Sequence, residues 1–594
     1  MYDKSVFVWI FRCSVFVGLL SAVVTVIYLT PIPELQHASC LRQCHELDWP
    51  MICRVKLVLE VSSAVTRSSS SCGHNSTECV EGCGRRVGPI KAKLLTANGL
   101  APGPTIEVCE KDILVVDVVN RAPGAAVSVH WRGQAQRETP YMDGAPMVTQ
   151  CPVNTFTTFQ YKFRATNPGT HVWQVHTGNP ELDSLFGALI VRQSPKKEPH
   201  HDLYDEDDHF VLISTSPSID NLGSGALLIN GKPFGQEGEA QLNVTSYKRH
   251  RLRLMYAVAS ISCPVTVAID RHSLLVIALD GHPIRPVEAL SVVMAPGERV
   301  DAVLTADQDL GDYQLKVTTT AECTTKLQGL ALVSYQTHQS AQSPLTRLPQ
   351  HQPNLVKGLS TVGNGDCSTS DSQFLCLSKI QSLTKLPPEL TPERLPFTLF
   401  LPFDFVKPPP QYSVFDDSLR LPRLNNLTLT FPSSPLLSHA ADLEVCNSNA
   451  RPSPCEEQAM CQCVHVVEVP LHTPVELMLI DQGGEGSHTF HLHGHSFHVV
   501  GVAGRGEGVR RGAEYGRLPR QLHNPVVKDT VTVPAGGAVA LRFKADNPGY
   551  WLLHDERWQG LGVIFRVGST SDTPPLPDNF PTCGDFVGPE FFLI

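Results

Sequence analysis

One short sequence occurs twice in this chain, and the repeat constrains the fold more than any other feature. Residues 165–169 read Ala-Thr-Asn-Pro-Gly, and residues 545–549 read Ala-Asp-Asn-Pro-Gly. Each copy follows a basic residue and precedes a tryptophan and then a histidine, namely Arg164, Trp173 and His176 in the first copy and Lys544, Trp551 and His554 in the second. Because self-similarity indicates duplicated structure, we expect two related domains whose equivalent strands face each other.

The rest of the chain favours short strands. β-rich runs at 113–119, 210–213, 330–335 and 539–543 are bounded by Gly, Pro, Asn or Asp. The 47 Pro and 43 Gly suit many turns, and no long stretch after residue 35 carries a helical apolar stripe. A chain of 594 residues is also too long for a single core. The sequence therefore predicts an all-β protein built from several sandwiches or barrels.

The N-terminal residues predict export. Lys4 and Arg12 precede an apolar run at 13–29. Residues 1–30 are therefore interpreted as a cleaved signal peptide, with an uncleaved signal anchor as the alternative because of the length of the run. In the first case the protein is secreted, and in the second it is tethered to the plasma membrane through residues 13–29. Both cases place the remaining chain outside the cell.

Cysteine usage also indicates an oxidising compartment. Of the 18 Cys, a dense group lies in a Cys-rich segment at 31–85: Cys40, Cys44, Cys53, Cys72, Cys79 and Cys83. Their irregular spacing lacks paired CxxC units, which favours disulfides over a zinc site. Acceptor sequons at Asn75, Asn243 and Asn426 are compatible with a glycoprotein.

Charge and composition separate the units but suggest no partner. The net charge is −10 and no Lys/Arg run is present, so we expect no nucleic-acid partner. The stretch 194–208 is interpreted as a linker whose acidic run, Asp205 to Asp208, is a solvated loop. A second linker, polar and rich in Ser and Pro, is expected at 341–392.

Histidines predict a metal site near the second repeat. Four of them lie within residues 488–495: His488, His491, His493 and His495. His491 and His493 are two residues apart, so on a strand they point to the same face. Imidazole is a preferred ligand of copper and zinc, and this density is unusual for a surface loop.

At this point the sequence resembles a known family, the multicopper oxidases. Four segments resemble the four copper motifs of that family in chain order: 130–133, 169–178, 487–499 and 551–556. The segment 136–152 is similar to arthropod laccases. The resemblance implies three cupredoxin-like Greek-key domains in series, at 86–195, 205–340 and 393–570, followed by a tail at 571–594. In this family a blue copper takes electrons from substrate, and a trinuclear cluster between the first and third domains reduces dioxygen.

The resemblance implies that part of the copper ligand set is retained. The type 2 copper would use His130 and His491, and one type 3 copper would use His176, His493 and His554. The remaining positions are substituted. Arg132, Gln174 and Glu556 stand at the ligand positions of the second type 3 copper, and a protonated guanidinium cannot coordinate a metal.

The blue copper site is expected to be lost as well. His488 is retained, but Asp555 stands at the position of the cysteine thiolate, without which no blue site forms. The segment from Glu556 to Gly562 is also shorter than the family spacing. Copper is therefore expected, if at all, only at the type 2 position and one type 3 position, and no complete catalytic set remains.

Three contacts follow from this interpretation. By resemblance, Cys151 is expected to pair with Cys583. Asp555 is expected to contact His488. Arg132 and Glu556 are expected to form a buried ion pair where the second type 3 copper would stand, with Gln174 hydrogen-bonded to one of them, because a buried cavity does not leave polar groups unpaired.

The sequence leaves three functions open. The chain is most similar to the insect multicopper oxidase-related proteins that have lost copper ligands, which favours an exported protein with a binding or extracellular structural role and an unidentified extracellular partner. The alternatives are a residual copper-binding oxidoreductase that uses the remaining histidines, and a working laccase-type oxidase.

Overall fold

The computed structural model describes most of the chain, in two units that are considered separately: Met1–Gln43 and Cys44–Ile594. The described residues are 4–29, 40–46, 48–66, 90–177, 185–215, 226–233, 240–257, 263–321, 323, 325–337, 355–362, 374–407, 420–440, 443–446, 461–484, 486–504 and 518–583. Cys72, Cys79, Cys83, the sequon at Asn75 and two stretches of the expected second linker, 341–354 and 363–373, lie outside them.

The first unit contains one helix, α1 (Lys4–Leu29), which is apolar along its length and exposes large side chains such as Trp9, Phe11 and Phe16. Cys13 on this helix is an exposed free thiol. Among the described residues, no helix combines the length and the hydropathy that crossing a membrane requires.

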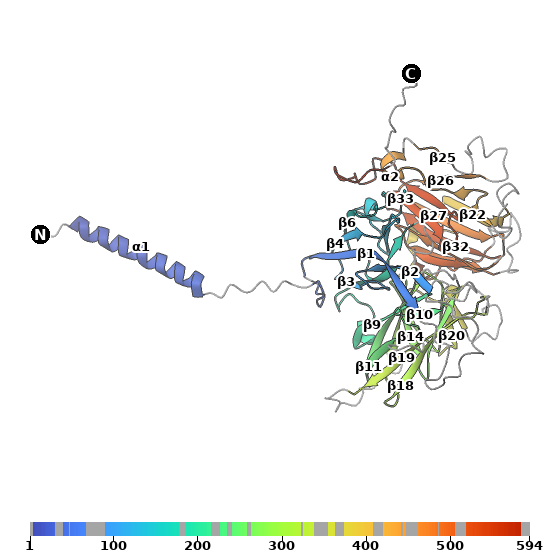
Figure 1. Ribbon diagram of the computed structural model, residues 1–594, viewed down its shortest axis with the longest axis horizontal. Coiled ribbons are helices and arrows are strands. Elements are labelled where there is room, and N and C mark those ends of the chain that lie inside the picture. Colours follow the sequence, from blue (N-terminus) through green and yellow to red (C-terminus); the bar gives the residue numbers. More distant parts are fainter. Residues whose placement is uncertain are drawn as a thin grey trace, which may run out of the picture. The chain divides into compact units, whose positions relative to one another are not determined.

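The described residues of the second unit are almost entirely β-structure, and their strands form six sheets that pack in pairs into three sandwiches (Figure 1). The first sandwich comprises one sheet in the order β2-β1-β4-β6 and another in the order β3-β8-β7-β5. The strand bounds are β1 (Ile52–Thr66), β2 (Ile90–Ala97), β3 (Ile106–Cys109), β4 (Ile113–Asn120), β5 (Ser128–Arg132), β6 (Thr158–Arg164), β7 (Gly169–His176) and β8 (Phe186–Arg192). Part of the Cys-rich segment, β1, thus belongs to this sandwich, because its alternate apolar residues Leu57 and Leu59 are buried in its core.

The second sandwich has sheet orders β10-β9-β12-β17-β14-β15 and β11-β19-β18-β13-β16-β20-β21. Its strands are β9 (Glu206–Thr215), β10 (Leu227–Ile229), β11 (Gln241–Thr245), β12 (Arg249–Tyr256), β13 (Val265–Ile269), β14 (Leu274–Leu279), β15 (His282–Ala289), β16 (Val292–Met294), β17 (Arg299–Thr305), β18 (Asp312–Thr319), β19 (Gln328–Gln336), β20 (Gly358–Ser360) and β21 (Phe374–Cys376). The last two strands lie within the segment interpreted as a linker, and the buried side chain of Leu359 anchors β20 to the core.

The interpretation of residues 205–208 as a solvated loop was wrong. Strand β9 begins at Glu206, and the side chain of Asp207 is only 13% exposed. Its carboxylate pairs with Arg192 of the first sandwich and Arg253 of the second, both at 2.6 Å. Asp205 and Asp207 are therefore held in place by guanidinium groups on neighbouring strands, whereas the side chain of Asp208 is exposed.

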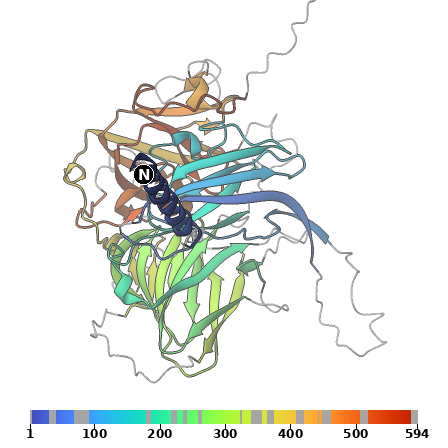
Figure 2. The ribbon, with the colours of Figure 1, turned by 90° about the vertical axis from the view of Figure 1, so that its left-hand side faces the viewer.

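The third sandwich has sheet orders β23-β22-β27-β32-β29-β30 and β24-β26-β34-β33-β28-β31, with β25 beside β26. Its strands are β22 (Phe397–Val406), β23 (Leu421–Leu424), β24 (Thr428–Leu429), β25 (Val445–Cys446), β26 (Gln462–Val469), β27 (Thr473–Asp481), β28 (His488–Leu492), β29 (Phe497–Ala503), β30 (Val527–Lys528), β31 (Thr530–Val533), β32 (Ala538–Ala545), β33 (Gly549–Asp555) and β34 (Gly562–Val567). Short helical turns complete the described chain: η1 (Pro140–Met142), η2 (His201–Leu203), η3 (Leu377–Lys379), η4 (Pro388–Leu390) and α2 (Leu436–His439). Figure 2 shows the blue and cyan strands of the first sandwich in a second view of the ribbon.

The sequence repeat corresponds to equivalent strands. Its two copies lead into β7 and β33, which pair with β5 and β28 respectively. Trp173 and Trp551 are fully buried, each against a glycine: a Cβ on Gly187 would lie 2.5 Å from Trp173, and a Cβ on Gly494 would lie 2.2 Å from Trp551. The prediction of duplicated domains with facing strands is confirmed, since His130 on β5 contacts His491 on β28.

The predicted disulfide between Cys151 and Cys583 is confirmed, and it ties the first sandwich to the segment that follows the third. Replacing both cysteines with serine is expected to lower the free energy of unfolding by about 2–4 kcal/mol, because the unfolded chain is no longer closed into a long loop. Guanidinium denaturation measures this loss. The matched control replaces Cys446 and Cys463, which close a loop of only 17 residues. An equal or larger loss in the control would contradict the loop-closure explanation.

Candidate metal centre between the first and third sandwiches

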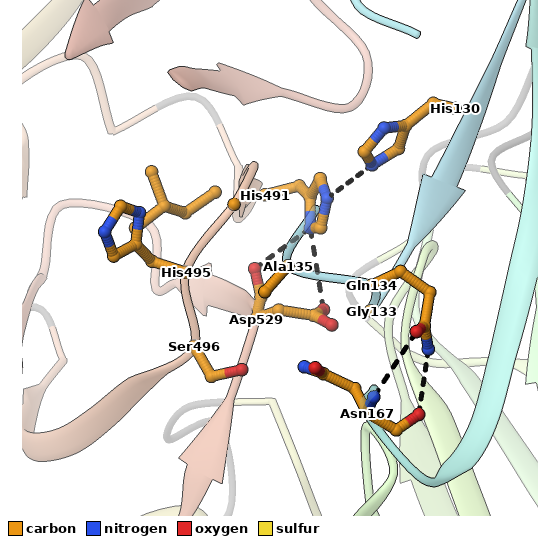
Figure 3. A pocket seen from close by; sticks show the side chains of 11 residues that line it. His130, Gly133, Gln134, Ala135, Asn167, His491, His495, Ser496 and Asp529 are labelled. Carbon is orange, nitrogen blue, oxygen red and sulfur yellow. Dashed lines mark hydrogen bonds and ion pairs between the residues drawn. The ribbon is translucent and has the colours of Figure 1, made fainter. Parts of the chain in front are cut away.

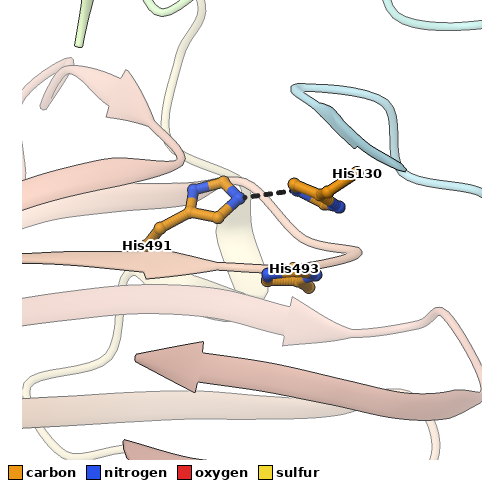
Figure 4. A group of neighbouring side chains, drawn as sticks. All are labelled: His130, His491 and His493. Atoms are coloured by element: carbon orange, nitrogen blue, oxygen red, sulfur yellow. Dashed lines mark hydrogen bonds between the residues drawn. The ribbon is translucent and has the colours of Figure 1, made fainter. Parts of the chain in front are cut away.

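Strands from two sandwiches bring the predicted histidines together. His130 comes from β5 of the first sandwich, and His491 lies on β28 of the third with His493 just after the end of that strand (Figure 4). All three side chains are almost completely buried. The Nε2 atoms of His130 and His491 are 3.1 Å apart, and the rings of His130 and His493 stack with centroids 3.8 Å apart. One ligand atom from each lies within 4.8 Å of the others.

The Nδ1 atoms of these histidines are anchored from behind. His130 Nδ1 lies 2.8 Å from the carbonyl oxygen of Asp143, and His491 Nδ1 lies 3.0 Å from that of Asp529. His493 Nδ1 lies 2.7 Å from the Asp143 carboxylate, whose pKa the two neighbouring imidazoles lower against its burial. Ligating histidines commonly donate the other N–H to such acceptors, which directs Nε2 toward the ion.

His554 and His176 complete the predicted set at somewhat longer range. The Nε2 atoms of His493 and His554 are 3.4 Å apart, and the ring centroids of His176 and His554 are 6.5 Å apart. Burial lowers the pKa of His554, and it lowers the pKa values of His176 and His491 more strongly; the Arg132 guanidinium lowers all three further. The pKa of His493 is lowered to about 3, first by burial and then by His130. These imidazoles are therefore neutral at pH 7, which is the form that binds metals.

The three substituted positions also converge, as predicted. Arg132 Nη1 and Glu556 Oε1 are 2.6 Å apart, with side chains that are 1% and 2% exposed. Arg132 also donates to the Gln174 side-chain oxygen at 3.3 Å and to the Thr530 hydroxyl at 3.1 Å. The pair packs against Gly297 of the second sandwich, where an added Cβ would come within 2.9 Å of Arg132 Nη1. A guanidinium thus supplies positive charge beside the histidines.

The predicted contact between His488 and Asp555 is confirmed. His488 Nδ1 lies 3.3 Å from Asp555 Oδ2, and both side chains are buried. The other oxygen, Oδ1, accepts backbone hydrogen bonds from Arg557 and Trp558, each at 2.8 Å. Phe405 stacks on the His488 ring with centroids 4.9 Å apart. The carboxylate at the end of β33 is therefore fixed by its own turn as well as by the imidazole.

A cavity of about 10 Å³ adjoins His130 and His491, which is about the space that one water molecule needs (Figure 3). Asp529 lies on one side of it, and Gln134 and Asn167, which hydrogen-bond to each other, lie on the other. His495 also lines it, and the His495 ring packs against Phe543 and Trp551.

Asp143, Asp529 and a charged network behind Asp529 were not identified from the sequence. Arg299 from the second sandwich forms two contacts to the Asp529 carboxylate, at 2.7 and 2.5 Å. Arg299 is also 3.6 Å from Asp280, which pairs with Lys528 at 2.9 Å. Asp143 lies in the segment 136–152 that resembles arthropod laccases, but nothing in that segment signals its histidine partner His493, which comes from the third sandwich.

Comparison with known proteins agrees with this architecture. Multicopper oxidase family models match residues 84–196, 199–338 and 430–569, one in each sandwich. The chain is 28% identical over 561 residues to Laccase-9 of Arabidopsis thaliana, covering 82% of this chain and 88% of that protein. It is also 28% identical over 552 residues to an L-ascorbate oxidase of Brassica rapa subsp. pekinensis, covering 83% and 91% respectively.

Solved structures show the same fold. The structure of Fet3p, described as a multicopper oxidase that functions in iron import, aligns with a TM-score of 0.64 at 19% identity over 89% of this chain and 94% of that one. The laccase of Botrytis aclada aligns with a TM-score of 0.62 at 22% identity over 89% of each chain. At these identities the likeness concerns the fold, which is three cupredoxin-like domains.

Proposed function

Because the chain belongs to the multicopper oxidase superfamily, we propose that it is an exported member without laccase-type oxidase activity, which uses the three-domain scaffold for binding or for an extracellular structural role. The observation that carries the proposal is the buried Arg132–Glu556 ion pair, 2.6 Å long, beside the histidine centre. A guanidinium at this point supplies a fixed positive charge and no lone pair, so it excludes a copper ion from the second type 3 position.

The position where the family has its blue copper supports the same conclusion. Asp555 is engaged by His488 and by two backbone N–H groups, so its carboxylate already has partners. A carboxylate lacks the thiolate on which a blue copper site depends. Electrons from a phenol would then have no entry site, whatever the histidine centre binds. We also propose that the chain is one of the insect multicopper oxidase-related proteins, because Arg132, Gln174, Asp555 and Glu556 stand where copper ligands are expected.

The extracellular assignment is supported by cysteine pairing and by accessible sequons. Disulfides join Cys44 to Cys109 and Cys263 to Cys323 as well as Cys151 to Cys583, which suits an oxidising compartment. The side chains of Asn243 and Asn426 are exposed, so both can accept a glycan. The partner in this compartment is proposed to be extracellular and not a nucleic acid.

Purified full-length protein tests the proposal directly. We expect no blue absorption band after copper loading, and no oxidation of a phenol or a diamine above the blank, with an active laccase as the positive control. Copper content is measured on the same sample. A blue band together with turnover would refute the proposal.

A second candidate is a residual copper protein, favoured by the anchored Nδ1 atoms of His130, His491 and His493. With Nδ1 engaged, the Nε2 atoms are free to hold copper, the type 2 ion by His130 and His491 and one type 3 ion by His176, His493 and His554. Copper there would supply a redox-active centre without a blue site. Up to two equivalents of copper without turnover would support this candidate.

A further inference from the structure

A second cluster of metal-ligating side chains lies in the second sandwich, on strands that contribute nothing to the histidine centre. Glu206, Asp208 and His209 come from β9, and His250 comes from the neighbouring strand β12. One ligand atom from each lies within 4.8 Å of all the others. We propose that these four residues bind one divalent cation of the zinc class, independently of any copper at the histidine centre.

A register shift brings the four residues to one place. β9 and β12 run parallel, with His250 opposite Glu206 but Leu252 opposite His209, so β9 contains one extra residue between these pairs. On a regular strand, residues 206 and 209 would point to opposite faces. An added residue reverses this alternation, and such bulges commonly redirect side chains at functional sites. The extra residue in β9 therefore brings Glu206 and His209 to the same side of the strand, next to His250.

The distances match the edges of a tetrahedral site. With metal–ligand bonds of 2.0–2.1 Å, neighbouring ligand atoms around zinc are about 3.3 Å apart. His209 Nε2 is 3.1 Å from His250 Nδ1 and 3.3 Å from Asp208 Oδ1. Glu206 Oε2 is 3.2 Å from His250 Nδ1. Three of the six edges thus have the required length before any ion is considered.

The protonation and hydrogen bonding of these groups also suit a ligand set. His250 Nε2 lies 3.1 Å from both the backbone N–H and the carbonyl oxygen of Thr245. The tautomer that donates from Nε2 to the carbonyl oxygen leaves Nδ1 with a free lone pair, and this is the tautomer that a metal ion at Nδ1 would select. Glu206 uses Oε1 to bind Lys248, which fixes the carboxylate and leaves Oε2 directed at His250.

The site is accessible, although its histidines are buried. His209 and His250 are 8% and 0% exposed, whereas the side chain of Asp208 is 68% exposed. Asp208 and His209 line a groove between the first and second sandwiches, together with Thr105 and Asn230. An ion can therefore enter on the Asp208 side. Two imidazoles with two carboxylates are typical ligands of zinc and similar ions, and they disfavour calcium and magnesium, which prefer oxygen alone.

Zinc titration of the full chain tests this assignment. The chelator-stripped protein is titrated by isothermal calorimetry, alongside Asp208→Asn and His209→Gln. The wild type is expected to bind one more equivalent of Zn²⁺ than His209→Gln, and Asp208→Asn is expected to bind that equivalent at least about tenfold more weakly. The matched controls are His201→Gln and Asp202→Asn, which change exposed residues close by and are expected to behave as wild type.

The variants separate a metal site from a hydrogen-bonded histidine pair. If His209→Gln folds poorly, Asp208→Asn carries the test, because its exposed side chain is replaced by one of the same shape. Unchanged stoichiometry and affinity in Asp208→Asn and in folded His209→Gln would overturn the proposal, and so would an equal loss in the control variants. Neither of these results bears on the proposed lack of oxidase activity, because the absorption band and the oxidation of phenols and diamines are measured in separate experiments.

Discussion

Replacing Glu556 with alanine is expected to lower the free energy of unfolding by about 3–5 kcal/mol, because it leaves the Arg132 guanidinium charged, buried and without its carboxylate. Arg132 is only 1% exposed, and its remaining hydrogen-bond partners in the described part of the chain, Gln174 and Thr530, are neutral. Neither can balance the charge. Guanidinium denaturation measures the loss.

The matched control for this variant is Glu60→Ala. Glu60 pairs with Arg121 at 3.1 Å, but these side chains are 45% and 56% exposed, so water replaces the lost partner. Its expected cost is about 0–1 kcal/mol. The double variant Arg132→Met/Glu556→Leu adds a second check, since removing both charges is expected to cost much less than removing one. A cost for Glu556→Ala no larger than that of Glu60→Ala would show that the ion pair does not hold the centre together.

The fold and the histidine centre could be predicted because their signals are local in the sequence. Short β-rich runs and the repeated Asn-Pro-Gly turn indicate strands whatever the long-range packing, and the family resemblance implied that there are three domains. The structure confirms three sandwiches. His491 and His493 lie on one short segment, so their spacing alone predicts a shared face. The Arg132–Glu556 pair was predictable because two opposite charges stand at positions that the family resemblance brings together.

The remaining features depend on contacts between distant segments. Asp143 and Asp529 support the histidines from two different sandwiches, and neither lies in a histidine motif. The cluster around His209 was hidden for another reason. A regular strand separates residues 206 and 209 onto opposite faces, and the register shift that reunites them depends on the pairing of β9 with β12.

The junction of the three sandwiches gives the second large expected effect. Arg299 is completely buried and contacts all three sandwiches: Thr170 of the first through its carbonyl oxygen at 3.4 Å, Asp280 of the second, and Asp529 of the third. Its two contacts to Asp529 form a planar fork that only arginine provides. Arg299→Met is expected to lower the free energy of unfolding by about 3–5 kcal/mol, because the Asp529 carboxylate stays buried without its strongest partner.

Arg423→Met is the matched control for the junction. Arg423 also forms a fork with a carboxylate, that of Asp404 at 2.9 and 2.6 Å, but both residues lie within the third sandwich and are 18% and 28% exposed. Its loss is expected to cost about 1 kcal/mol or less, because water reaches the carboxylate that remains. Arg299→Lys keeps the charge and loses the fork, so its cost should lie between the two. If Arg299→Met costs no more than Arg423→Met, the junction depends on apolar packing between the sandwiches, and the buried charges that support His491 contribute little to it.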